Sequence, residues 1–127
     1  MRFILITIMA VFAMSLHAQS DVDPRLTAKF APERLADLQK NHPSVIEYWT
    51  FYLDNAYYLA DLAPAKDASD LATVKIDDIS HFNILALDVH PMELGNRVYR
   101  IEGSDKLLVM HSIEKIAEMF NEYRRTR

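Results

Sequence analysis

The sequence feature that most constrains the fold is an aromatic-rich stretch at residues 44–62, SVIEYWTFYLDNAYYLADL. It holds six of the eleven aromatic residues that lie beyond residue 18. Its first part places six apolar or aromatic residues on one face of a helical wheel: Val45, Tyr48, Trp49, Tyr52, Leu53 and Ala56. Because Glu47 and Asp54 fall on the opposite face, the period of about 100° per residue predicts a helix over residues 45–56.

The predicted ends of this helix follow from side-chain chemistry. Ser44 is expected to be its N-cap, and Glu47 three residues later completes a capping-box pattern. Asn55 is expected to end it, since Asn tolerates left-handed backbone angles. Residues 56–62 then alternate in the manner of a strand. We expect these aromatic side chains to supply much of the core, although Phe51 lies off the main apolar face and leaves a stacking or partner-binding surface as an alternative.

The second half of the chain predicts a sheet and a closing helix. Residues 97–102 and 106–111 flank the sequence Gly-Ser-Asp, which is typical of a β-hairpin turn. Residues 82–89, FNILALDV, are predicted to form a third strand of this meander, with apolar residues on both faces. Residues 74–76 are expected to form a short edge strand. A helix capped by Ser112 is predicted over residues 112–123, with these apolar positions at helical spacing: Ile113, Ile116, Ala117, Phe120 and Tyr123.

These elements predict a single α+β domain over residues 31–127. It has two N-terminal helices, the first over residues 32–40 with Pro32 at its first position. A mainly antiparallel sheet of four to five strands follows, with a C-terminal β-hairpin and a closing C-terminal helix. Residues 19–30 are polar and are expected to form a mobile N-terminal arm.

The first 18 residues resemble a cleaved signal peptide. Arg2 is followed by an almost wholly apolar run over residues 3–16, and Ala18 is a small residue before the expected cut. This run is shorter than the roughly 20 residues of a membrane-spanning helix. The expected destination is therefore the periplasm, the outer membrane or the outside of the cell, and no transmembrane span is expected in the mature chain.

Composition excludes several kinds of site. The sequence has no Cys, which excludes disulfides, thiol nucleophiles, thiolate metal sites and a lipid-modified Cys. Its two glycines, Gly95 and Gly103, cannot form a glycine-rich phosphate loop. Arg2 is the single charged side chain before residue 19, so the mature chain would keep 13 basic and 18 acidic side chains, a net charge of −5. This balance argues against a nucleic-acid partner.

The histidines give one candidate site for chemistry. Asp88 and His90 lie on the same face of an extended chain, and His111 follows another predicted strand. A metal site or an acid–base pair built from these three side chains is conceivable, and a hydrolase using His90 or His111 with a carboxylate is the corresponding alternative. Surface histidines at strand ends are the preferred interpretation. No catalytic residue, metal site or cofactor is therefore predicted, and the protein is not expected to be an enzyme.

The favoured functional hypothesis is a small exported protein that acts through protein–protein contacts with an envelope partner. Its alternative is a small-ligand-binding module with an aromatic-lined pocket between helix and sheet. A cavity lined by Trp49, Tyr52 and Tyr58 would support the alternative, and a solid core would remove it. The candidate binding residues for either function are Trp49, Phe51, Tyr52 and Tyr58.

Overall fold

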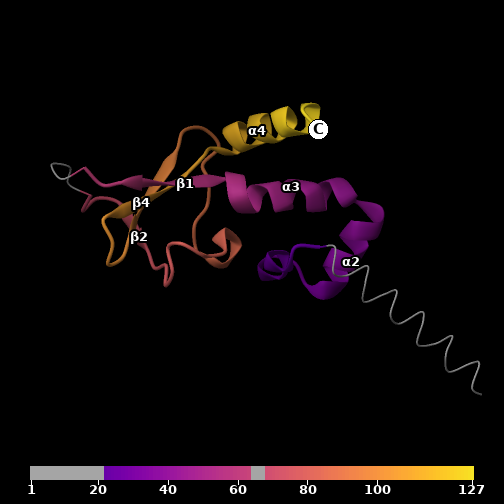
Figure 1. Cartoon of the computed structure of the whole chain (residues 1–127), viewed down its shortest axis with the longest axis horizontal. Helices are drawn as coiled ribbons and strands as arrows, with labels where there is room; N and C mark the ends of the chain where they lie inside the picture. Colours follow the sequence, from indigo (N-terminus) through magenta and orange to yellow (C-terminus); the bar gives the residue numbers. More distant parts are fainter. Residues whose placement is uncertain (1–21, 64–67) are drawn as a thin grey trace, which may run out of the picture. The chain divides into compact units, whose positions relative to one another are not determined.

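The computed structural model describes residues 22–63 and 68–127 of the chain (Figure 1). The predicted signal peptide, its cleavage after Ala18 and the first residues of the expected arm lie outside the described residues. The described residues form an α+β fold, as the sequence predicts, with three α-helices and a four-stranded sheet that is mixed rather than wholly antiparallel. It separates into two compact units, one up to Glu47 and one from Tyr48 to Arg127. No helix among the described residues is both long and apolar enough to cross a membrane.

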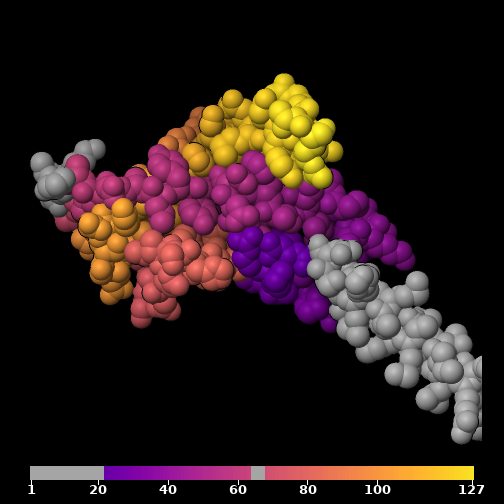
Figure 2. All heavy atoms as spheres, viewed as in Figure 1, coloured from indigo at the N-terminus to yellow at the C-terminus, as the bar shows by residue number. Residues whose placement is uncertain are grey.

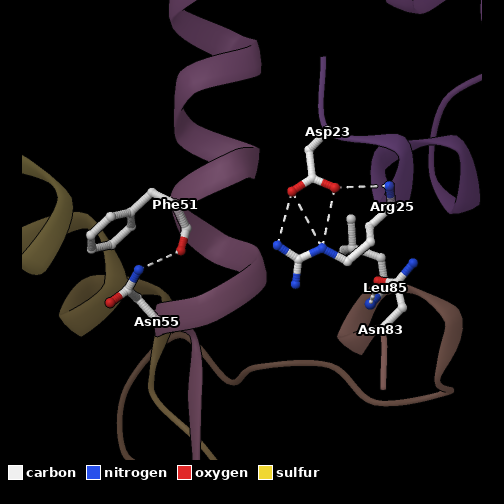
Figure 3. A network of polar contacts seen from close by, with 6 residues as sticks. All are labelled: Asp23, Arg25, Phe51, Asn55, Asn83 and Leu85. Carbon is white, nitrogen blue, oxygen red and sulfur yellow. Dashed lines mark hydrogen bonds and ion pairs between the residues drawn. The ribbon is translucent and has the colours of Figure 1, made fainter. Parts of the chain in front are cut away.

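The first unit contains the 3-10 helix η1 (Pro24–Ala28) and the helix α2 (Pro32–Asn41). Helix η1 falls within the segment that was expected to be a mobile arm, and its Leu26 is fully buried. The carboxylate of Asp23 accepts a hydrogen bond from the Arg25 amide at 2.9 Å and pairs with the Arg25 guanidinium at 2.9 Å (Figure 3). This hydrogen bonding lowers the pKa of Asp23. Helix α2 begins with Pro32, as predicted.

Helix α3 (Pro43–Asn55) starts one residue before the predicted cap. Pro43 is its first residue and Ser44 lies inside it, so the prediction that Ser44 caps the helix is wrong. The fixed backbone angle of proline suits a first helical position. Asn55 ends the helix as predicted, but by another mechanism, because only Gly95 and Gly103 among the described residues have a positive φ. The Asn55 side-chain amide instead donates a hydrogen bond to the Phe51 carbonyl oxygen at 2.8 Å (Figure 3).

The sheet has the strand order β1-β4-β3-β2. Its strands are β1 (Tyr57–Asp61), β2 (Ala72–Val74), β3 (Arg97–Ile101) and β4 (Lys106–Met110). Strands β3 and β4 form the predicted hairpin, whose turn contains Gly103 at φ 75°. Strand β1 pairs antiparallel with β4, while β2 pairs parallel with β3, which makes the sheet mixed. The predicted edge strand at residues 74–76 overlaps β2 only at Val74.

The strand predicted at residues 82–89 is wrong. This segment contains the short 3-10 helix η2 (Ile84–Ala86) and pairs with no strand of the sheet. The Asn83 side chain accepts a hydrogen bond from the Leu85 amide at 3.0 Å, which turns the backbone locally. Ile84 is nevertheless buried, and the Phe82 ring lies 5.2 Å from that of Tyr57. Ile84 and Val89 of this segment are thus buried without a strand, and β1 supplies the third antiparallel strand.

Helix α4 (Ile113–Arg125) closes the fold. Ser112 caps it as predicted, because its hydroxyl accepts a hydrogen bond from the Lys115 amide at 3.0 Å. Ile116 and Phe120 are buried, whereas Ile113 and Tyr123 are exposed and so extend the predicted apolar face beyond the core.

Candidate interaction surface

The register of the sheet divides its side chains between two faces. Side chains alternate along each strand, and paired residues point to the same side. One face holds buried residues of the core: Val74, Tyr99, Ile101, Leu108 and Met110. The opposite face, called here the outer sheet face, carries another apolar set: Tyr58, Ala60, Val98, Leu107 and Val109.

The outer sheet face is only partly covered. Tyr58 on β1 is 44% exposed, although it stands directly opposite the buried Val109 on β4. Ala60, Val98 and Leu107 are half-buried. A solvent-facing side of an antiparallel sheet normally carries polar residues. This side therefore carries an apolar strip across β1, β4 and β3, which is exposed at Tyr58, half-buried at Ala60, Val98 and Leu107, and buried at Val109.

Two polar side chains border this strip. The ring of His111 lies 5.2 Å from the Tyr58 ring at an angle of 43°. Burial lowers the pKa of His111, and the nearby charge of Lys115 lowers it further, so the imidazole is held towards its neutral form. On β3, exposed Arg100 has its guanidinium 3.5 Å from the Thr73 hydroxyl. The strip thus runs from the His111 imidazole to the exposed Arg100 cation.

Three of the four candidate binding residues, all except Tyr58, lie away from the outer sheet face. Together with other rings of α3 and α4 they form an aromatic cluster: Tyr48, Trp49, Phe51, Tyr52, Phe120 and Tyr123. Figure 2 shows the atoms of α4, in yellow, against those of α3, in magenta. The ring centroids of Tyr48 and Phe120 are 5.3 Å apart, and those of Phe51 and Tyr123 are 5.1 Å apart. These edge and tilted contacts are typical of packed aromatic cores.

The structure does not bring Trp49, Tyr52 and Tyr58 together as the lining of one pocket. The ring of Trp49 packs 4.8 Å from that of Tyr52, whereas Tyr58 lies against His111. Tyr52 is buried, and this burial, with Tyr48 and Tyr99 nearby, raises its pKa to about 12. Its phenol group therefore stays neutral and belongs to the core.

An open groove does lie beside the aromatic cluster. Phe51 contributes to it, and its other lining residues come from the end of α3 and from α4: Asn55, Lys115, Glu118, Met119, Glu122, Tyr123, Arg125 and Thr126. Of the four candidate residues, only Phe51 reaches this groove. The candidates are thus divided between the packed cluster, the groove and the outer sheet face.

The histidine candidates do not form the three-residue site considered from the sequence. Nε2 of His90 lies 3.3 Å from Oδ1 of Asp88, and both side chains are exposed. The His111 ring instead lies 5.2 Å from the Tyr58 ring, tilted at 43° to it. Within residues 22–63 and 68–127, no three His, Asp or Glu side chains are placed to hold a metal ion. The backbone of His90 is fixed by the Tyr99 hydroxyl, which accepts from its amide at 3.1 Å.

Comparison with protein-family models, curated proteins and solved structures found no match for this chain. Sequence reasoning selected Tyr58 but missed its neighbours Val98, Leu107 and Val109. The available signal was the uninterrupted apolar run of β4, which places apolar side chains on both faces of one strand.

Proposed function

We propose that this is a small exported protein that acts through protein–protein contacts in the cell envelope, with the outer sheet face as its contact surface. The observation that carries the proposal is the apolar strip around half-exposed Tyr58. Contiguous apolar surface on a folded protein commonly marks an interaction site. Export follows from the signal-like sequence of residues 1–18.

The chemistry of the strip suggests what the partner presents. Tyr and Arg are enriched among the residues that contribute most to protein–protein binding. Tyr58 offers a large ring on β1, at one side of the strip, and Arg100 offers a cation on β3, at the other side. We expect the partner to bring an apolar surface over Tyr58 and a carboxylate towards Arg100.

The small-ligand alternative would use the groove beside Phe51. Ligand sites are usually enclosed and mainly apolar. This groove is open and is bordered by four charged side chains: Lys115, Glu118, Glu122 and Arg125. The outer sheet face is therefore the preferred functional surface.

The test is affinity isolation of the C-terminally tagged, exported protein from detergent-solubilised envelopes of its own host, with quantitative mass spectrometry. We expect one stoichiometric envelope partner with the wild-type protein, and its loss with Tyr58→Ser. Leu94→Ser is the matched control, because Leu94 is 70% exposed but lies outside the strip. Circular dichroism checks that both variants fold. Recovery of the protein alone, or equal recovery of the partner with Tyr58→Ser, would overturn the proposal.

A further inference from the structure

The N-terminal end of α4 carries a second exposed apolar surface, separate from the outer sheet face. Met92 is 41%, Leu94 70% and Ile113 46% exposed. They lie together because the Ile113 amide donates a hydrogen bond to the Met92 carbonyl oxygen at 2.8 Å. Exposed Glu93 and Glu114 accompany them, and their backbones are joined by a 3.4 Å hydrogen bond. We call these five residues the acidic apolar end of α4.

The other end of α4 has the opposite charge. Arg124 and Arg127 lie over the rings of Phe120 and Tyr123, with guanidinium carbons 5.7 Å and 5.3 Å from the ring centroids. Arg125 adds a third guanidinium, which pairs with Glu122. Tyr123 is 38% exposed. We call Tyr123, Arg124, Arg125 and Arg127 the basic aromatic end of α4.

We propose that the acidic apolar end binds the basic aromatic end of α4 in a second copy of this chain, forming a two-fold symmetric dimer with antiparallel α4 helices. The charges are complementary, since the glutamates of one copy face the arginines of the other. The exposed apolar side chains of the first end meet the exposed ring of Tyr123. This pairing also sets the two helix dipoles antiparallel.

Two-fold symmetry follows from the spacing of the ends. Ile113 and Tyr123 are ten residues apart, which is about 15 Å along a helix axis. Each copy carries both ends, so one two-fold axis near the middle of α4 forms both contacts at once and closes the assembly. Glu118 lies near this axis, so the Glu118 carboxylates of the two copies would repel each other. The ammonium group of Lys115 in the same copy lies 3.9 Å from the Glu118 carboxylate and reduces this repulsion.

The first measurement is the mass in solution of the untagged, exported protein, by analytical ultracentrifugation over a range of concentrations. We expect a monomer–dimer equilibrium that weakens by about tenfold or more from 0.1 M to 1 M salt, because the Debye length falls from about 10 Å to about 3 Å. Leu94→Ser should weaken it by a similar factor, whereas Tyr58→Ser should leave it unchanged. This contrast separates the dimer from the proposed envelope contact.

Charge reversal gives the sharper test. One variant carries Glu93→Lys and Glu114→Lys, and a second carries Arg124→Glu and Arg125→Glu. Each variant alone carries charges of the same sign at both ends of α4 and should be monomeric. An equal mixture of the two variants should form a heterodimer whose dissociation constant is within about threefold of that of the wild-type dimer. The restored mixture also shows that both variants fold. A monomeric wild type, a dimer that withstands both reversals, or a mixture that stays monomeric would overturn the proposal.

Discussion

Ser112 fixes the start of α4 through one hydroxyl group, which accepts a hydrogen bond from the Lys115 amide. Removing an N-cap hydroxyl by substitution with Ala costs about 1 kcal/mol, whereas Gly costs only a few tenths. We therefore expect Ser112→Ala to lower the free energy of unfolding by about 1 kcal/mol and Ser112→Gly to lower it much less. Urea unfolding followed by circular dichroism measures both. Equal losses in the two variants would contradict a capping role.

His111 gives the stability a defined pH dependence. Its folded-state pKa is lowered, first by burial and then by Lys115. The unfolded chain takes up a proton on this side chain near pH 6.5, so it binds more protons than the folded chain just below that pH. The contribution of His111 is complete above about pH 6.5 and is lost as the pH falls towards the folded-state pKa.

The matched variant for this effect is His111→Gln, which cannot titrate. We expect the wild-type protein to lose more unfolding free energy than His111→Gln between about pH 7.5 and about pH 5.5. Urea unfolding at the two pH values checks this, because the other titrating groups are common to both proteins. Identical losses would show that His111 is not the responsible group.

At the scale of the element, strand β4 carries two faces with different consequences for stability. Leu108 is fully buried on the core face, whereas its neighbour Leu107 is half-buried on the outer sheet face. Leu108→Ala should lower the free energy of unfolding by about 2–5 kcal/mol, because it leaves a cavity. Leu107→Ala should cost about 1 kcal/mol. Chemical denaturation of both variants tests the face assignment, and similar costs would refute it.

The packing of α3 against α4 depends on Phe120, whose ring meets Tyr48 and Phe51. We expect Phe120→Ala to cost about 3–5 kcal/mol, since a buried aromatic side chain is removed. Trp49 is the single tryptophan of the chain and lies 5.2 Å from Tyr48, so its fluorescence should also change. Asn121→Ala on the exposed side of α4 is the control. An unchanged emission spectrum and stability in Phe120→Ala would show that the cluster does not join the helices.

At the scale of the whole molecule, charge limits the choice of partners. The formal net charge is −4, and several cations are already paired with carboxylates of the same chain, as in Arg25–Asp23 and Lys106–Asp61. We expect no retardation of double-stranded DNA in a gel-shift assay at about 0.15 M salt, because DNA affinity needs clustered, available cations. A shifted band with micromolar protein would contradict this expectation and would direct attention to the arginines at the end of α4.

The sequence alone determined the features that depend on near neighbours. Helical periodicity located α2, α3 and α4, and the cap at Ser112 was predicted because its hydrogen-bond partner lies three residues away. The β3–β4 hairpin was predicted for the same reason, since Gly103 permits the turn between two apolar runs. The sequence also named Tyr58 as a candidate binding residue, which stays a prediction.

The tertiary structure alone decided which segments became strands and which faces stayed open. Residues 82–89 have the apolar content of a strand, but they form a short 3-10 helix in which Asn83 accepts a local hydrogen bond, and the Phe82 ring contacts Tyr57. Strand β1 takes the place beside β4, a pairing between residues about 50 positions apart. An apolar sequence pattern indicates that its side chains prefer burial. It does not indicate which distant segment buries them, so the outer sheet face could be recognised only from the strand order.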